Sequence, residues 1–132
     1  MDLHEEIRSA LDKCPDQETK TQYETRLEKG SLARDEDIHS HFCAYFVPYN
    51  PANKTILVGD HKKSGLWLMP GGHIDANESL LETVNREIEE ELGVANFFSE
   101  RPEPFNPVFN RTLCWYLWLN TSGTANSFRY AI

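Results

Sequence analysis

Residues 72–94, GHIDANESLLETVNREIEEELGV, contain the pattern that decides the fold class of this chain. On a helix of about 100° per residue, five aliphatic side chains fall on one face over an arc of roughly 120°. Asn77 is the expected N-cap, and Gly93 is the expected residue at which the helix ends. The segment therefore predicts a half-buried helix over residues 78–92 with this buried stripe: Leu80, Leu81, Val84, Ile88 and Leu92.

The same segment concentrates acidic residues, with six glutamates and one arginine between residues 78 and 91. Glu87, Glu90 and Glu91 lie at i, i+3 and i+4 on an arc beside the apolar stripe, where like charges repel. Arg86 reaches Glu90 at i+4 but cannot neutralise three carboxylates. A solvated acidic face is the usual explanation of such a run. Because this run borders an apolar stripe and follows a glycine turn, a site for Mg²⁺ or Mn²⁺, which prefer oxygen ligands, is a competing one.

Upstream, residues 2–13 have apolar side chains at helical spacing, and residues 16–29 are polar and helix-prone. The first helix is expected to end at Cys14–Pro15 and the second at Gly30. The first 30 residues therefore predict a helical hairpin packed on the domain. Because their apolar content is low, a solvated charged arm is the alternative.

The rest of the chain predicts strands around the helix. Pro70–Gly72 is an expected turn, and a loop containing Pro102, Pro104 and Pro107 is expected before the last strand. This order predicts an α+β fold rather than a regular βαβ alternation. The expected strands cover residues 42–49, 55–58, 66–69, 94–98 and 108–120.

Composition narrows the classes of function. The 132 residues suit one domain, and the net charge of −8 argues against binding a nucleic-acid backbone. The longest apolar run, residues 113–119, is far shorter than the roughly 20 residues of a membrane helix. The N-terminus lacks the features of a secretory signal. Three cysteines without a CxxC pair indicate reduced thiols, so we expect a cytoplasmic protein.

At fixed spacing, residues 72–94 match every specified position of G-x5-E-x7-R-E-U-x-E-E-x-G-U, where U is bulky and aliphatic. The segment thus resembles a complete Nudix box. The resemblance implies the Nudix hydrolase fold, a mixed β-sheet sandwiched by helices, over residues 41–132, with an N-terminal helical extension over residues 1–40. Only 38 residues follow Val94, and residues 121–132 lack helical periodicity. The closing helix usual in the family is therefore not expected, and the C-terminal part is expected to be short or truncated.

The resemblance also implies an activity, the Mg²⁺-dependent hydrolysis of a diphosphate linkage in a nucleoside diphosphate joined to a further group. Mn²⁺ is the alternative cofactor. The implied catalytic and metal-binding carboxylates are those of Glu87, Glu90 and Glu91, and the backbone carbonyl of Gly71 is a further metal ligand. The general base is Glu87 in some members and a later glutamate in others, for which Glu100 and Glu103 are candidates. The residues implied to support the box are Gly72, Glu78, Arg86 and Gly93.

Several other side chains have two interpretations. His73 could bind a phosphate oxygen or lie on the surface, and Lys63, with His61 and Lys62, could steer a polyphosphate or simply end a charged hairpin. Trp67 is expected in the core rather than as a base-stacking platform. His39, His41 and Cys43 alternate and could share a strand face as soft-metal ligands, but no fourth ligand is evident, so this site is not expected.

Two alternatives to a hydrolase stay open, a Nudix-fold module that senses a nucleotide without cleaving it, and an inactive truncated member. The retained glutamates favour the enzyme. The box does not identify the leaving group, so ADP-ribose, dinucleotides, nucleotide sugars and oxidised nucleoside triphosphates are all candidate substrates. The sequence also leaves open whether the protein forms a homodimer.

Overall fold

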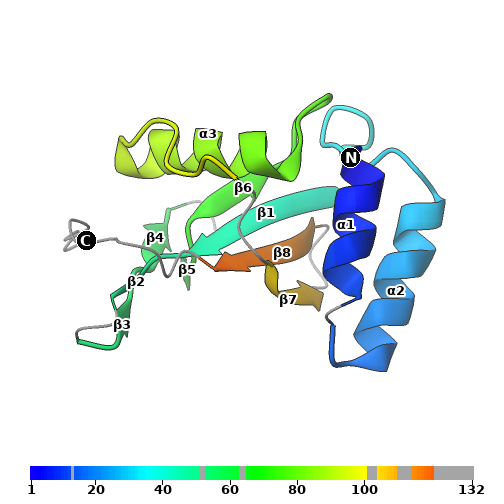
Figure 1. The fold of residues 1–132 in the computed structure, drawn as a ribbon, viewed down its shortest axis with the longest axis horizontal. Coiled ribbons are helices and arrows are strands. Elements are labelled where there is room, and N and C mark those ends of the chain that lie inside the picture. The colour runs from blue at the N-terminus through cyan, green and yellow to red at the C-terminus, as the bar shows by residue number, and fades with distance from the viewer. Residues whose placement is uncertain (13, 51–52, 63–64, 101–103, 110–113, 121–132) are drawn as a thin grey trace.

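A computed structural model describes residues 1–12, 14–50, 53–62, 65–100, 104–109 and 114–120. Two helices open the chain, a series of strands follows, and a third helix separates these strands from the last two (Figure 1). In chain order the elements are α1 (Leu3–Leu11), α2 (Gln17–Glu28), β1 (His41–Val47), β2 (Tyr49–Asn50), β3 (Thr55–Ile56), β4 (Gly59–His61), β5 (Leu66–Leu68), β6 (Gly71–His73), α3 (Leu80–Leu92), β7 (Pro104–Phe109) and β8 (Cys114–Asn120).

The central sheet is mixed, as predicted. Its strand order is β6-β1-β8-β7, in which β1 and β8 run parallel and the other neighbours run antiparallel. Helix α3 lies along β6 and β1, whereas the α1–α2 hairpin packs at the end of the sheet where β1 begins (Figure 1). The short pairs β2–β3 and β4–β5 form separate antiparallel hairpins. This α+β arrangement places α3 directly beside the β1–β6 strand pair.

The N-terminal hairpin is part of the hydrophobic core, so the alternative of a solvated arm is wrong. Ile7, Leu11 and Leu27 are each at most 1% exposed and belong to the same buried cluster as the core residues of the sheet and α3. The ring of Tyr23 on α2 packs 6.0 Å from that of Phe42 on β1. Burial of each such side chain contributes about 1.5–3 kcal/mol, which outweighs the poor amphipathicity of α2.

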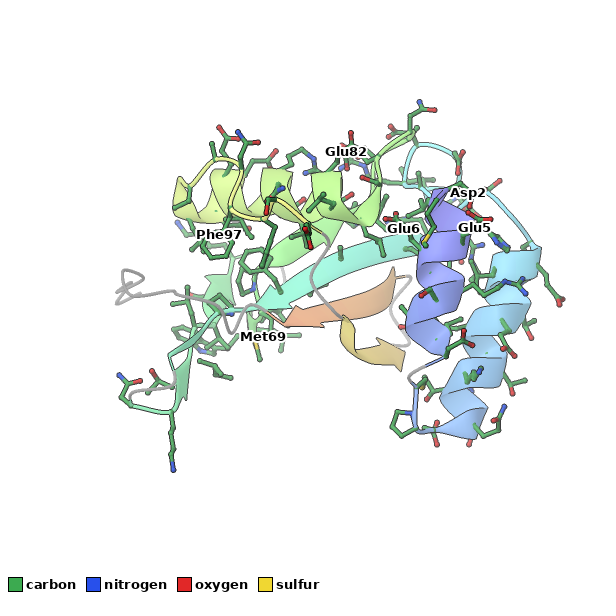
Figure 2. All side chains as sticks on the ribbon, in the orientation of Figure 1. Asp2, Glu5, Glu6, Met69, Glu82 and Phe97 are labelled. Atoms are coloured by element: carbon green, nitrogen blue, oxygen red, sulfur yellow. The ribbon has the colours of Figure 1, made fainter. Side chains whose placement is uncertain are left out.

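A buried carboxylate joins this hairpin to α3. The Glu6 side chain is 6% exposed and accepts a hydrogen bond of 2.8 Å from the backbone N–H of Leu80, the first residue of α3. Figure 2 shows Glu6 at the end of α1 that faces the start of α3. The first N–H groups of a helix have no partner within the helix, and negative charge is favourable there. Glu6 on α1 therefore accepts from the N–H of the first residue of α3, which has no acceptor within the helix.

We expect Glu6→Gln to lower the free energy of unfolding by about 1–2 kcal/mol, because it removes the charge from this hydrogen bond. Urea unfolding at neutral pH measures the change. Glu24→Gln, at an exposed position on α2, is the matched control and is expected to stay within about 0.5 kcal/mol of the wild type. Equal losses in the two variants would contradict the capping role of Glu6.

Helix α3 begins two residues later than expected. Asn77 is not the N-cap: it has a φ of 68°, whereas Ser79 accepts from the N–H of Glu82 and the Glu82 side chain accepts in return from the N–H of Ser79. This reciprocal capping box stabilises a start at Leu80. The helix ends at Gly93, as predicted. Within the stripe, Leu81 is only half-buried, while Thr83 and Glu87 are buried beside the predicted aliphatic residues.

Three strand expectations are corrected. Residues 94–98 do not form a strand, because the chain turns at Ala95–Asn96. The Asn85 side chain hydrogen-bonds both the N–H and the carbonyl of Phe98, at 2.9 Å each, so these groups do not pair with a strand. The proline-containing segment expected as a loop contains β7, which lies at the edge of the sheet, where a strand tolerates proline. Residues 108–120 are accordingly divided between β7 and β8.

Candidate metal-binding cleft

A cleft of about 610 Å³ lies between α3, the β1–β6 pair and the β4–β5 hairpin. Helix α3 contributes its acidic side to this cleft, and the segment around β6 forms the facing wall. Its lining residues are Arg34, Tyr45, Gly59, Asp60, Lys62, Leu68, Met69, Pro70, Gly71, Gly72, His73, Asp75, Arg86, Glu87, Glu90 and Glu91.

Two glycines bring the backbone of this wall close to its neighbours. Gly71 has a φ of 142°, and a Cβ there would collide with the backbone of β1 at Ala44 and Tyr45. A Cβ on Gly72 would stand 2.7 Å from Cδ of Glu87. Glycine at both positions therefore lets β6 pair with β1 and lets the Glu87 carboxylate lie against the strand. Gly71 and Gly72 of the expected turn therefore begin β6. Because glycine has no side chain, this strand is hard to predict from the sequence.

The Glu87 carboxylate is buried, with its residue 7% exposed. Burial raises the pKa of Glu87, hydrogen bonding from Arg86 opposes this rise, and the negative charges of Glu90 and Glu91 add to it. Burial thus makes the ionised carboxylate of Glu87 less favourable than in water, and Glu90 and Glu91 add further negative charge beside it. Such a site is electrostatically suited to a divalent cation with oxygen ligands.

Arg86 organises the carboxylates around it. Its Nε and one terminal nitrogen donate to the two oxygens of Glu78 at 2.7 and 2.9 Å, and that same terminal nitrogen also donates to the backbone carbonyl of His73 at 2.9 Å. The other terminal nitrogen donates to Glu87 at 2.6 Å and lies 3.5 Å from the Glu90 carboxylate, the predicted i+4 pair. A planar guanidinium holds these groups in one fixed relation, linking the loop before α3 to the helix.

Hydrogen bonding from Arg86 holds the pKa of Glu78 below its usual value of about 4.5, despite partial burial. A lowered folded-state pKa stabilises the fold above the usual value, and this stabilisation is lost as the pH falls through the lower, folded-state pKa. We expect Glu78→Gln to cost about 1–2 kcal/mol at neutral pH. The difference from the wild type should shrink as the pH falls below about 4.5.

Urea unfolding of both proteins across the acid range measures this difference. Glu89→Gln, at an exposed position of α3, is the matched control for removing one charge. A cost of Glu78→Gln that did not change with pH would show that the ionised form of Glu78 does not provide the stabilisation.

The structure brings most of the sequence-predicted site residues into the cleft. The three helix glutamates, Gly71, Gly72 and Arg86 line it, together with His73. Glu78 is not among the described lining residues but accepts a hydrogen bond from Arg86, which lines the cleft. Gly93 ends the helix. Lys62 lines the cleft, whereas Lys63 lies outside the described residues. Of the candidate bases, Glu103 also lies outside them, and Glu100 is exposed and is not among the described residues that line the cleft.

Two findings depart from the sequence analysis. Arg34 lines the cleft from the connection between α2 and β1, with a terminal nitrogen 2.9 Å from the Asp75 carboxylate. No sequence signal marks this position, because it lies far from the box and outside any regular element. Trp67 is 60% exposed on β5. The expectation that it belongs to the core is therefore wrong, since β5 pairs with β4 alone and no layer of the described structure covers it.

Comparison with known proteins agrees with the fold described above. The sequence model of the NUDIX domain matches residues 39–126. The chain therefore belongs to the Nudix family.

Among solved structures, a MutT/nudix family protein from Enterococcus faecalis is similar, with 22% sequence identity and a TM-score of 0.45. The similarity covers 87% of this chain and 46% of that one, so the present chain spans about half the length of that relative. No curated protein matches the chain.

Two further observations concern expectations from composition. None of the helices in the described ranges is long and apolar enough to cross a membrane. No disulfide joins Cys14 and Cys43, and the side chain of Cys114 is not described.

Proposed function

We propose that the protein is a Mg²⁺-dependent hydrolase of nucleoside diphosphate derivatives and that the α3 glutamates form its metal site. The observation that carries this proposal is the convergence of Glu87, Glu90 and Glu91 on one cleft opposite the Gly71–Gly72 backbone. The family assignment supports hydrolysis as the general class of reaction. The metal, the substrate and the roles of single residues are our inference.

The donor set fits a hard divalent cation. The proposed ligands are the carboxylates of Glu87, Glu90 and Glu91 and the backbone carbonyl of Gly71, which are all oxygen donors of the kind that Mg²⁺ and Mn²⁺ prefer. Burial raises the pKa of Glu87, so a cation beside this carboxylate would stabilise its ionised form. When bound, a divalent cation would neutralise charge on the diphosphate and lower the pKa of a coordinated water.

The chain's own residues would perform the remaining tasks. Among the described residues, Arg34 and Lys62 are the Lys and Arg side chains that line the cleft outside the box, and they would bind phosphate oxygens of the substrate. Glu87 is the best-placed candidate to accept a proton from the attacking water. It lies within the cleft, beside the proposed metal site. Arg86 and Glu78 would hold Glu87 in place rather than contact the substrate.

The test is to incubate the purified protein with Mg²⁺ and a panel comprising ADP-ribose, a dinucleotide, a nucleotide sugar and an oxidised nucleoside triphosphate. Products are separated by chromatography. We expect cleavage of at least one diphosphate linkage, and its products identify the substrate class. If a cooperatively folded protein binds one of these compounds and cleaves none, the proposal fails and the sensing module replaces it.

A further inference from the structure

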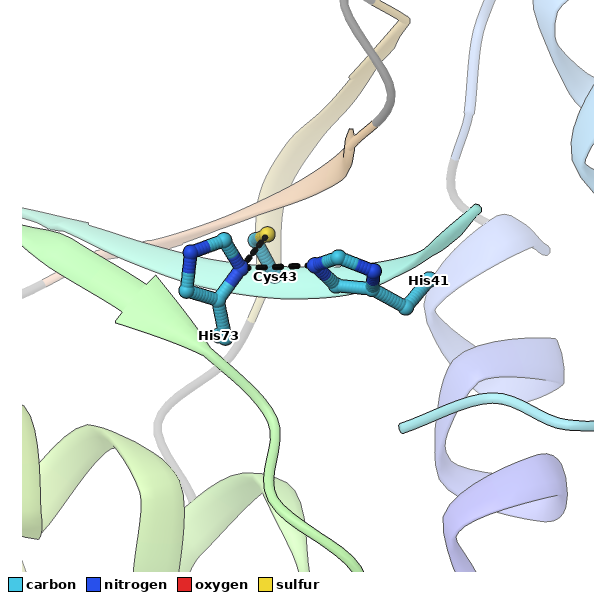
Figure 3. A group of neighbouring side chains, drawn as sticks. All are labelled: His41, Cys43 and His73. Carbon is cyan, nitrogen blue, oxygen red and sulfur yellow. Dashed lines mark hydrogen bonds between the residues drawn. The ribbon is translucent and has the colours of Figure 1, made fainter. Parts of the chain in front are cut away.

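His41, Cys43 and His73 form a second cluster of potential metal ligands, separate from the α3 glutamates (Figure 3). His41 and Cys43 are two residues apart on β1 and therefore point to the same face of the sheet. His73 lies on β6, and its Cα is the register partner of that of Cys43. The ligand atoms of the three side chains all lie within 4.8 Å of one another. The pairing of β1 with β6 therefore brings the three side chains together.

The orientation of His41 is set by the chain before β1. Its Nδ1 lies 2.9 Å from the backbone oxygen of Asp37. A carbonyl oxygen only accepts, so Nδ1 carries the proton, and in the neutral ring Nε2 then has the lone pair. That lone pair points at Nδ1 of His73, 2.7 Å away. Histidines that bind metals usually donate one ring N–H to a backbone carbonyl or carboxylate, which directs the other ring nitrogen at the metal.

Two neighbours converge on one atom of His73. Its Nδ1 lies 2.7 Å from Nε2 of His41 and 3.3 Å from Sγ of Cys43. A ring nitrogen has a single in-plane site, which holds either one proton or one lone pair. One proton at Nδ1 can point at only one of the two neighbours, whereas a cation between the three atoms would be coordinated by all of them.

Burial and donor type indicate which cation would fit. The exposed fractions of His41 and Cys43 are 3% and 0%, and a buried thiolate is unfavourable without a cation beside it. Two imidazole nitrogens and a thiolate suit a borderline-soft ion such as Zn²⁺, and not Mg²⁺. Tetrahedral Zn²⁺ separates two nitrogen ligands by about 3.3 Å and a nitrogen and a sulfur ligand by about 3.6 Å. The spacing of the two imidazole nitrogens would grow by about 0.6 Å and that of His73 Nδ1 and Cys43 Sγ by about 0.3 Å, while His41 Nε2 and Cys43 Sγ, within 4.8 Å of each other, would come to about 3.6 Å.

We propose that His41 Nε2, Cys43 Sγ and His73 Nδ1 together bind one Zn²⁺-class ion. Binding replaces the S–H bond of Cys43 with a sulfur–metal bond and the N–H bond at Nδ1 of His73 with a nitrogen–metal bond. The thiol proton is released to solvent, and the neutral His73 ring carries its proton at Nε2 instead. Three protein ligands leave the fourth tetrahedral position for water or another small donor. His73 also lines the glutamate cleft, so this ion would lie at its edge. The proposal is independent of the proposed hydrolase activity because it uses none of the three helix glutamates.

The test is a Co²⁺ titration of the whole protein in the presence of excess Mg²⁺, which occupies oxygen-ligand sites. Co²⁺ reports a cysteine ligand through a thiolate charge-transfer band in the near ultraviolet. We expect this band to saturate at one equivalent of Co²⁺ and to disappear when Zn²⁺ is added. A folded wild-type protein that shows no thiolate band overturns the proposal.

Variants then locate the ligands. Cys43→Ser is expected to abolish the band, while the control Cys14→Ser, at a half-buried cysteine between α1 and α2, is expected to retain it. His41→Gln keeps the thiolate and serves if Cys43→Ser does not fold. It should weaken Zn²⁺ binding by more than about 100-fold, since loss of outer-shell partners alone costs about 10- to 100-fold. A band that survives Cys43→Ser, or unchanged Zn²⁺ affinity in folded His41→Gln, overturns the assignment.

Discussion

Replacing Glu90 with glutamine is expected to reduce Mg²⁺-dependent hydrolysis by at least about 100-fold while leaving the fold intact. Glu90 lines the cleft with its side chain 59% exposed, so it contributes little packing. Loss of one carboxylate ligand would remove roughly 3 kcal/mol of transition-state stabilisation, which corresponds to about 100-fold in rate. The turnover number on the best substrate of the panel measures this effect, and a thermal melt checks the fold.

The matched control is Glu89→Gln, which removes the same charge from the adjacent residue. Glu89 is exposed and is not among the described residues that line the cleft. We expect this variant to retain turnover within about twofold, because an exposed charge that does not line the cleft acts on it through water, where the interaction is about 1 kcal/mol or less. Equal losses in the two variants would mean that general charge on α3 matters and that Glu90 is not a ligand.

Arg86→Ala is expected to lower the free energy of unfolding by about 3 kcal/mol. Its guanidinium makes four hydrogen bonds, to Glu78, Glu87 and the carbonyl of His73, and the Glu87 side chain is only 9% exposed. Removing one member of a largely buried ion pair leaves the other charge uncompensated, which costs about 3–5 kcal/mol when burial is complete. Urea unfolding at neutral pH measures the loss.

Arg34→Ala is the control for this second variant. Arg34 contacts Asp75 at 2.9 Å, but its side chain is 45% exposed. An exposed pair of this kind contributes about 0–1 kcal/mol. If Arg86→Ala were no more destabilising than Arg34→Ala, the network around Arg86 would have no structural role.

The local features of α3 could be predicted from the sequence because they depend on side chains close in the chain. The aliphatic stripe and the end at Gly93 follow from helical periodicity and glycine C-capping. The start was misplaced because Asn77 and Ser79 are both good capping residues. Only the reciprocal contact between Ser79 and Glu82 decides between them.

Features that depend on distant segments could not be predicted. The Glu6–Leu80 contact joins residues 74 positions apart, and Arg34 reaches the cleft from an irregular connection. The two glycines of β6 have no side chains from which a strand could be predicted, and their role appears only beside β1 and α3. The same is true of His73, whose pairing with Cys43 depends on the register of β6 against β1.

The central claim is that the glutamate cleft hydrolyses a diphosphate linkage with a divalent cation. Its most direct test follows turnover of one panel substrate by the wild-type protein with Mg²⁺, after chelation with EDTA, and after Mg²⁺ is restored. We predict cleavage that stops with EDTA and recovers with Mg²⁺. Hydrolysis that continues unchanged in EDTA, or no hydrolysis by the folded protein with Mg²⁺, would contradict the account.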